Sequence, residues 1–268
     1  MRLLMTHRIQ SVLFALAVAL PLAASAQTAP VIGIVVMHGK GGSPERLVAP
    51  LADGLTQKGY RVANLEMPWA GKRNYDKDVA AAEQEVTAAL TELRNKGAKK
   101  LFVAGHSQGA VFALHYAGKH PLDGLIIIAP GGNVATAFYQ QQIGASVSRA
   151  RHLVTSGKGD ERGEFDEYEG GRGNWSVNTT AAIYLTWFDP DGAMNQEKSS
   201  AALPKSLPVL HVAPTSDYPA LLRAKQSMFK ALPDHPLKRL YEPNSDHRNA
   251  PRDSVDEIAR WAVEVTAR

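Results

Sequence analysis

The sequence contains no cysteine. This absence excludes disulfide bonds, catalysis by a cysteine nucleophile, and lipid attachment through the cysteine of a bacterial lipoprotein. A strong charge of one sign is also missing, because 30 Lys and Arg residues face 26 Asp and Glu residues. A charge this close to balance gives no reason to expect nucleic acid as a partner. The remaining composition, 44% hydrophobic over 268 residues, is that of a globular protein with one sizeable core.

A hydrophobic run long enough to span a membrane is missing at the N-terminus. Residues 12–24 are uncharged over 13 positions, whereas a spanning helix needs about 20. Arg2 and Arg8 precede this run and Ala24-Ser25-Ala26 follows it, which is the pattern of a secretory signal peptide with a small-residue cleavage site. We expect residues 1–26 to be removed and the protein to be exported to the periplasm or the medium, without a stable membrane anchor. An uncleaved anchor is the alternative.

Short apolar runs alternate with helical patterns along residues 27–268. This alternation predicts a single α/β domain, with a mainly parallel central sheet covered by helices on both faces. The expected strands are rich in aliphatic and β-branched residues, and they are Val31–Met37, Arg61–Glu66, Lys100–Ala104, Leu125–Ala129, Pro208–Val212 and Lys238–Tyr241. The expected helices are Pro44–Lys58, Asp78–Asn95, Gln108–Lys119, Pro219–Leu232 and Asp253–Val265.

One connection is longer than the fold needs. Residues 130–206 contain no convincing strand, yet a complete βαβ unit takes only about 30 residues or a little more. We therefore expect a cap or lid inserted after the Leu125–Ala129 strand. Asn133 is expected to be the N-cap of a helix running toward Gly157. The Gly163–Asn178 stretch carries four glycines and mixed charge, which predicts a loop.

The pentapeptide Gly105-His106-Ser107-Gln108-Gly109 lies between a predicted strand and a predicted helix. A serine at such a tight turn is forced into strained backbone geometry, and glycines two residues away on either side remove side chains that would collide there. Its hydroxyl would project above the carboxyl ends of the strands. The backbone N–H of Gln108 would lie at the helix start, where it can meet a developing oxyanion. The pattern predicts Ser107 as a nucleophile; the alternative is a chance match on an ordinary turn.

With this elbow, the sequence resembles the α/β-hydrolase superfamily over nearly all of residues 27–268. The resemblance implies the α/β-hydrolase fold and a second oxyanion donor in the loop after the first central strand, often within a His-Gly motif. Here His38-Gly39-Lys40-Gly41-Gly42 follows that strand. We expect the backbone N–H of Lys40 to be the donor and His38 to orient the loop.

The family's chain order of nucleophile, acid and histidine directs the choice of the other two residues. His247 lies in the loop after the last predicted strand and is the expected base. Asp217 follows the penultimate predicted strand and is the expected acid that orients His247. Asp189 and Asp191 remain alternatives for the acid, although their Asp-Pro-Asp-Gly setting favours a turn. Asp246 is adjacent to His247 in sequence and is poorly placed to orient its ring.

These residues predict a serine hydrolase that cleaves a carboxylic ester in a small-molecule acyl substrate through a Ser107 acyl-enzyme. The same residues would suit an amidase, a peptidase, a thioesterase or an acyltransferase. A non-catalytic exported binding protein on the same scaffold is a further alternative, although binding alone needs no triad. No organic cofactor is implied, and no metal is implied because His-x-x-x-His spacing is absent.

Overall fold

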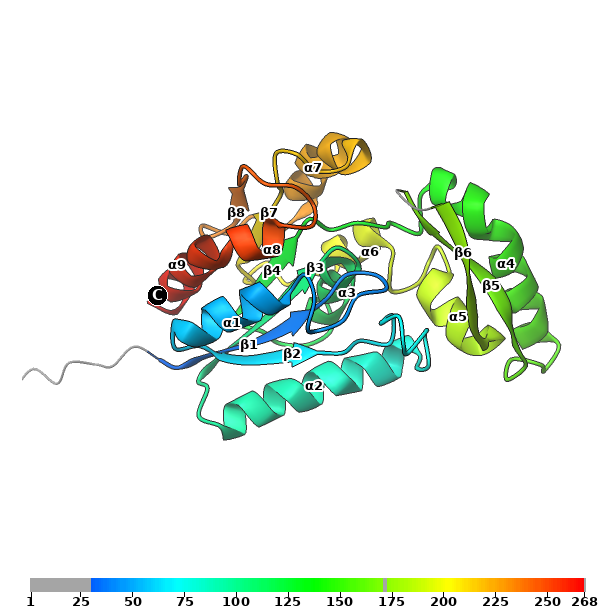
Figure 1. Cartoon of the computed structure of the whole chain (residues 1–268), viewed down its shortest axis with the longest axis horizontal. Helices are drawn as coiled ribbons and strands as arrows, with labels where there is room; N and C mark the ends of the chain where they lie inside the picture. The colour runs from blue at the N-terminus through cyan, green and yellow to red at the C-terminus, as the bar shows by residue number, and fades with distance from the viewer. Residues whose placement is uncertain (1–29, 171–172, 268) are drawn as a thin grey trace, which may run out of the picture.

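A computed structural model describes residues 30–170 and 173–267. The predicted signal peptide, residues 1–26, lies outside the described residues. The centre of the molecule is a six-stranded, all-parallel sheet with the order β2-β1-β3-β4-β7-β8 (Figure 1). Its strands are β1 (Ile32–Met37), β2 (Arg61–Leu65), β3 (Lys100–His106), β4 (Gly124–Ile128), β7 (Val209–Val212) and β8 (Arg239–Tyr241). All six predicted strands occur, and the predicted α/β-hydrolase fold is confirmed.

Helices cover both faces of this sheet. One face packs against α2 (Val79–Asn95) and α3 (Gln108–Ala117), and the other packs against α1 (Ala49–Gln57), α8 (Ala250–Asp253) and α9 (Val255–Thr266). Every residue of β1 and β4 is buried, as expected for parallel strands covered on both sides. The remaining helix of this part, α7 (Pro219–Ala231), has no fully buried residue.

Neighbouring side chains of β1 serve opposite faces. Val35 belongs to the core under α2 and α3, whereas Ile34 and Val36 belong to the core under α1 and α9. This period of two gives the sheet two separate apolar cores.

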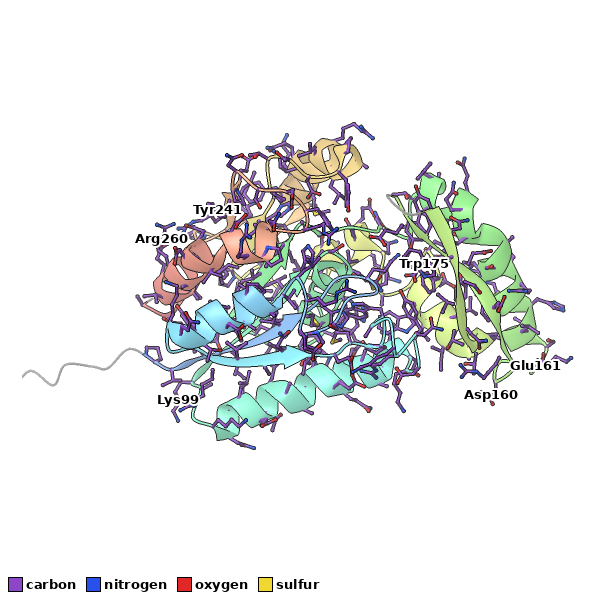
Figure 2. The ribbon with its side chains drawn as sticks, in the orientation of Figure 1. Lys99, Asp160, Glu161, Trp175, Tyr241 and Arg260 are labelled. Atoms are coloured by element: carbon purple, nitrogen blue, oxygen red, sulfur yellow. The ribbon has the colours of Figure 1, made fainter. Side chains whose placement is uncertain are left out.

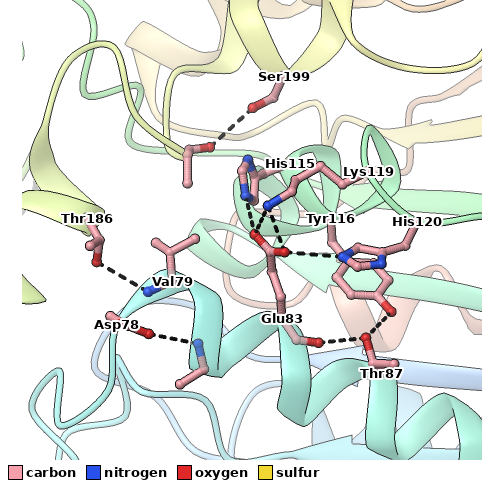
Figure 3. A network of polar contacts seen from close by, with 12 residues as sticks. Asp78, Val79, Glu83, Thr87, His115, Tyr116, Lys119, His120, Thr186 and Ser199 are labelled. Atoms are coloured by element: carbon pink, nitrogen blue, oxygen red, sulfur yellow. Dashed lines mark hydrogen bonds and ion pairs between the residues drawn. The ribbon is translucent and has the colours of Figure 1, made fainter.

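A buried carboxylate also joins α2 to the C-terminal end of α3. Glu83 accepts hydrogen bonds from Lys119 Nζ at 2.6 Å, from His115 Nε2 at 2.8 Å and from His120 Nε2 at 3.2 Å (Figure 3). The charge of Glu83 is therefore matched by donors from the neighbouring helix and the turn that follows it.

The long connection between β4 and β7 forms a compact insertion. It comprises α4 (Ala137–Thr155), the antiparallel pair β5 (Arg162–Glu169) and β6 (Gly173–Thr180), α5 (Ala181–Phe188) and α6 (Gln196–Ala201). Figure 1 shows α4, β5, β6 and α5 as a separate layer beside the central sheet. We call residues 130–206 the insertion.

The prediction of a loop at Gly163–Asn178 was wrong, since this stretch is the β5–β6 hairpin. Phe165 and Glu167 on β5, and Val177 and Thr179 on β6, are buried at alternate positions. Two of these four buried side chains are polar, so the apolar alternation that predicts a strand was hidden.

The start of α4 also differs from the prediction. The N-cap is Thr136, whose hydroxyl accepts a hydrogen bond from the backbone N–H of Tyr139 at 3.2 Å. Asn133 instead accepts from the N–H of Ala135 at 3.1 Å and from that of Gln196 at 3.3 Å. Its side chain stabilises a turn and contacts the start of α6, because a short amide readily hydrogen-bonds nearby backbone groups.

Aromatic side chains join the insertion to the sheet domain. The ring centroid of Trp187 on α5 lies 5.5 Å from the ring centroids of both Trp69 and Phe112. Its indole N–H donates to the backbone carbonyl of Lys77 at 2.8 Å. Figure 2 shows side chains filling the space between the two layers, with Trp175 on the insertion side. The insertion and the α2–α3 face of the sheet thus share one apolar core.

In the part of the chain that the structure describes, none of the helices has both the length and the apolar character that crossing a bilayer requires.

Candidate active site

Ser107 occupies the turn between β3 and α3 with φ 55° and ψ −118°. A positive φ is strained for a residue with a side chain. A Cβ at Gly105 would lie 2.1 Å from the carbonyl oxygen of Gly109, and one at Gly109 would lie 2.6 Å from that of Met37. Neither position has room for a side chain, so the two glycines are what allow the turn to form.

The structure brings Ser107, His247 and Asp217 into one hydrogen-bonded row. His247 Nε2 lies 3.1 Å from Ser107 Oγ, and His247 Nδ1 lies 2.8 Å from Asp217 Oδ1. A carboxylate only accepts, so Nδ1 carries the ring proton and donates it to Asp217. Nε2 is then free to accept the hydroxyl proton of Ser107, which is the arrangement a general base needs.

Two loop segments hold Asp217 and His247 in register. The chain after β7 runs parallel to the chain after β8, and the N–H of Ser216 donates to the carbonyl of Ser245 at 2.9 Å. Asp217 Oδ1 also accepts from the N–H of Tyr218 at 2.7 Å. The pairing of β7 with β8 therefore extends beyond the sheet and sets the position of the acid against the histidine.

The other aspartates considered from the sequence have different partners. Asp189 forms an ion pair with Arg151 at 3.0 Å and accepts from the N–H of Asp191, as in a turn. Asp246 accepts from the backbone N–H groups of Arg248 and Asn249. Of these aspartates, Asp217 is the one that contacts His247.

His106, which the sequence analysis did not single out, supports the histidine loop. Its Nε2 lies 2.8 Å from the carbonyl oxygen of His247 and donates to it. Burial, with a smaller contribution from His247, lowers the pKa of His106 to about 3. His106 is thus a neutral donor that fixes the backbone of His247 against the elbow. Its position inside the elbow motif is the one sequence signal that could have found it.

Tyr218 is a second residue that the sequence analysis missed. The centroid of its ring lies 4.6 Å from that of the His247 imidazole, and its side chain is partly exposed beside Ser107 and His247.

His38 holds the glycine-rich loop after β1, as predicted. Its Nδ1 donates to the carbonyl of Gly39 at 2.7 Å, and its Nε2 accepts from the N–H of Met67 at 3.1 Å. Burial lowers the pKa of His38, which suits a ring that must keep one nitrogen unprotonated. A Cβ at Gly39 would lie 3.0 Å from the Cβ of Ser107, so this loop approaches the serine closely.

The two amides predicted as oxyanion donors remain available. Within residues 30–170 and 173–267, the backbone N–H groups of Lys40 and Gln108 have no hydrogen-bond acceptor. Gln108 is the first residue of α3, where an N–H has no partner inside the helix.

An open cavity of about 330 Å³ lies at this site. It is lined by Ser107, His247 and Tyr218, by loop residues 38–43, by Glu169 of the insertion and by the exposed Arg46 and Arg248. Across the described ranges, no group of three His, Cys, Asp or Glu side chains could hold a metal ion.

Comparison with known proteins agrees with this architecture. Residues 28–161 match the family described as serine aminopeptidase, S33. Among solved structures, a thermostable carboxyl esterase from Bacillus coagulans is 18% identical with a TM-score of 0.61, covering 88% of this chain and 89% of the esterase. A monoacylglycerol lipase from Paleococcus ferrophilus is 20% identical with a TM-score of 0.57, covering 88% of this chain and 94% of the lipase.

Est1E from Butyrivibrio proteoclasticus, solved with ferulic acid bound, is 16% identical with a TM-score of 0.60, covering 89% of this chain and 91% of Est1E. No curated protein matches the sequence. The family match spans half of the 268 residues and includes the Ser107 elbow. The chain therefore belongs to the serine aminopeptidase S33 family and has the α/β-hydrolase fold.

Proposed function

We propose that this protein is a serine hydrolase that cleaves carboxylic esters through an acyl-enzyme on Ser107. The observation that carries the proposal is the row Ser107 Oγ, His247 Nε2, His247 Nδ1 and Asp217 Oδ1, joined at 3.1 and 2.8 Å at the wall of an open cavity. A binding protein needs no such row.

The reaction follows from the positions of these groups. Ser107 Oγ attacks the acyl carbon while His247 Nε2 takes the hydroxyl proton, and Asp217 stabilises the imidazolium that forms. The N–H groups of Lys40 and Gln108 stabilise the charge on the former carbonyl oxygen. His247 then returns the proton to the leaving alcohol, and the ester C–O bond breaks. Water attacks the acyl-enzyme in the same way and releases the acid.

We also propose that the insertion acts as a cap for this site. Glu169 at the end of β5 lines the cavity together with Ser107 and His247. Side chains of the insertion would then contact the part of the substrate that lies away from the reacting carbon.

A peptidase is the second candidate, because the family description is that of an aminopeptidase. An aminopeptidase must bind a substrate ammonium group. The cavity wall carries two exposed arginines, Arg46 and Arg248, and one carboxylate, Glu169. Because the two arginine charges outnumber the one carboxylate, the wall favours neutral or anionic substrates over an ammonium group. The structural neighbours that act on esters support the same choice.

A matched substrate pair tests the choice of ester over peptide. We expect p-nitrophenyl acyl esters to be hydrolysed with a kcat/KM at least 100-fold above that of an amino-acid p-nitroanilide. A panel of increasing acyl length then measures how the cavity selects its substrate. Faster hydrolysis of the anilide would instead identify an aminopeptidase.

We propose that the protein is exported after cleavage behind Ala26. The mature protein would then begin at Gln27. Intact-mass measurement of the protein made from the full-length sequence tests this. A mass that still includes Met1 through Ala26 would contradict it.

A further inference from the structure

The side chain of Lys40 points away from the proposed oxyanion hole and into the insertion. Its Nζ forms an ion pair with Glu167 at 2.9 Å, and it donates to the hydroxyl of Tyr139 at 3.0 Å and to the carbonyl of Tyr168 at 2.8 Å. The ring of Trp175 lies 5.6 Å from the same atom. All of these partners belong to the insertion, although Lys40 belongs to the loop after β1.

The side chain of Gln108 reaches the same carboxylate through Tyr75. Gln108 Nε2 donates to the hydroxyl of Tyr75 at 2.9 Å, and that hydroxyl donates to Glu167 Oε1. The carbonyl of Tyr75 accepts from the hydroxyl of Thr179 on β6 at 2.7 Å. Tyr75 has φ 56°, so its strained backbone is held by the hairpin as well.

The contacts of Lys40 and of Gln108 therefore converge on one oxygen atom, Glu167 Oε1. It contacts Lys40 directly and Gln108 through one hydroxyl. Lys40 and Gln108 are also the two residues whose backbone N–H groups form the proposed oxyanion hole. The exposed fraction of Glu167 is 1%, so water does not compete for these contacts.

The protonation states of Lys40 and Tyr75 keep both residues bonded to Glu167. Burial alone would lower the pKa of Lys40, but the attraction of Glu167 and the contact with Tyr139 outweigh it and raise the pKa. Burial, followed by the charge of Glu167, raises the pKa of Tyr75 well above its usual range. Lys40 thus stays charged and Tyr75 stays a hydrogen-bond donor.

We propose that Glu167 is a positioning residue that sets the oxyanion hole by tying the β5–β6 hairpin to the side chains of Lys40 and Gln108. The inference rests on the proposed function, because it assigns a role in the same site. Without the carboxylate, the ammonium of Lys40 would be buried without its counter-charge and would have to move, and the glycine-flanked loop would move with it. In this proposal, the oxyanion hole takes its working shape only while the β5–β6 hairpin keeps its contacts with Lys40 and Gln108.

The test compares Glu167→Gln, Tyr75→Phe and the control Glu164→Gln in the full chain. Tyr75→Phe removes the hydroxyl that links Gln108 to Glu167, and it keeps the Lys40–Glu167 ion pair. The side chain of Glu164 is exposed on the same strand. Each variant is assayed for kcat and KM on one p-nitrophenyl ester. Each is also assayed for inhibition by a trifluoromethyl ketone, which forms an oxyanion on Ser107, and by the matching non-electrophilic ether, which only fills the cavity.

For Glu167→Gln we expect a loss in kcat of about 100-fold, the scale of losing one oxyanion donor. KM and ether binding should stay within threefold, and inhibition by the ketone should weaken in step with kcat. Tyr75→Phe should lower kcat and weaken ketone inhibition by about 10-fold, with KM and ether binding again within threefold. This variant keeps the test valid if Glu167→Gln does not fold. Glu164→Gln should match the wild type.

Folded Glu167→Gln and Tyr75→Phe variants with kcat and ketone affinity within twofold of the wild type would overturn the role of Glu167. An inactive Ser107→Ala beside them would show that the proposed function survives that result. A wild-type protein that hydrolyses no ester and binds no ketone would overturn both.

Discussion

At the residue scale, the acid is the part of the proposed triad for which the sequence left alternatives open. Asp217 Oδ1 accepts from His247 Nδ1 at 2.8 Å, whereas Asp189 is paired with Arg151 in the insertion. A carboxylate at the position of Asp217 holds the imidazole of His247 in the tautomer that can accept a proton from Ser107.

Asp217→Asn should keep the shape of the site but favour the wrong tautomer of His247. In a serine protease triad the corresponding change lowers kcat by about 10⁴-fold, and we expect a loss of about 10³- to 10⁴-fold here. Asp189→Asn, measured under the same conditions on the same ester, should stay within a few fold of the wild type. Should Asp189→Asn lose activity and Asp217→Asn keep it, the acid would lie in the insertion.

At the scale of elements, the α2–α3 contact depends on one carboxylate. Glu83 is buried, and its partners His115, Lys119 and His120 all come from α3 or the turn after it (Figure 3). Burial alone would raise the pKa of Glu83, but the hydrogen bonds from Lys119, His115 and His120 outweigh it and lower the pKa. The folded state therefore prefers the charged carboxylate more than the unfolded state does.

Glu83→Gln should lower the free energy of unfolding by about 2 kcal/mol at pH 7, the scale of hydrogen bonds to a charged group. A lowered folded-state pKa contributes stability above the unfolded pKa and loses it as the pH falls through the folded value. The difference between the unfolding free energies of wild type and variant should therefore be present above about pH 4.3 and shrink as the pH falls below it. Urea unfolding at several pH values measures this.

Glu92→Gln is the matched control, since Glu92 is an exposed residue of the same helix that forms an ion pair with the exposed Lys96. It should change the unfolding free energy by less than about 0.5 kcal/mol. If the difference in unfolding free energy between wild type and Glu83→Gln is the same at pH 7 and pH 3, Glu83 is not the charged carboxylate assigned to it.

Element by element, the sheet and the placement of Ser107, Asp217 and His247 at one edge of it could be predicted because their signals are local. Each central strand is a short apolar run, and Ser107, Asp217 and His247 each follow one of these runs. The β5–β6 hairpin could not be predicted in this way, because Glu167 occupies a buried strand position. That position is explained only by Lys40, which lies more than 100 residues earlier in the chain.

At the scale of the whole molecule, the site is assembled from three separate parts of the chain. The elbow and the glycine-rich loop come from the first half, and Asp217 and His247 follow β7 and β8. The insertion supplies Glu167, and its Glu169 lines the cavity. Contacts such as that of His106 with the carbonyl of His247, 141 residues apart, leave no periodic pattern in the sequence. They become visible only when the parts are packed together.

The central claim is that Ser107 is a nucleophile activated by His247. The most direct measurement is covalent labelling of the folded wild-type protein with a fluorophosphonate, followed by peptide mass analysis to locate the modified residue. We predict one label per chain, on Ser107, with loss of ester hydrolysis in proportion to labelling and no label on folded Ser107→Ala. A folded wild-type protein that stays unlabelled, or a Ser107→Ala variant labelled as strongly as the wild type, would contradict the account.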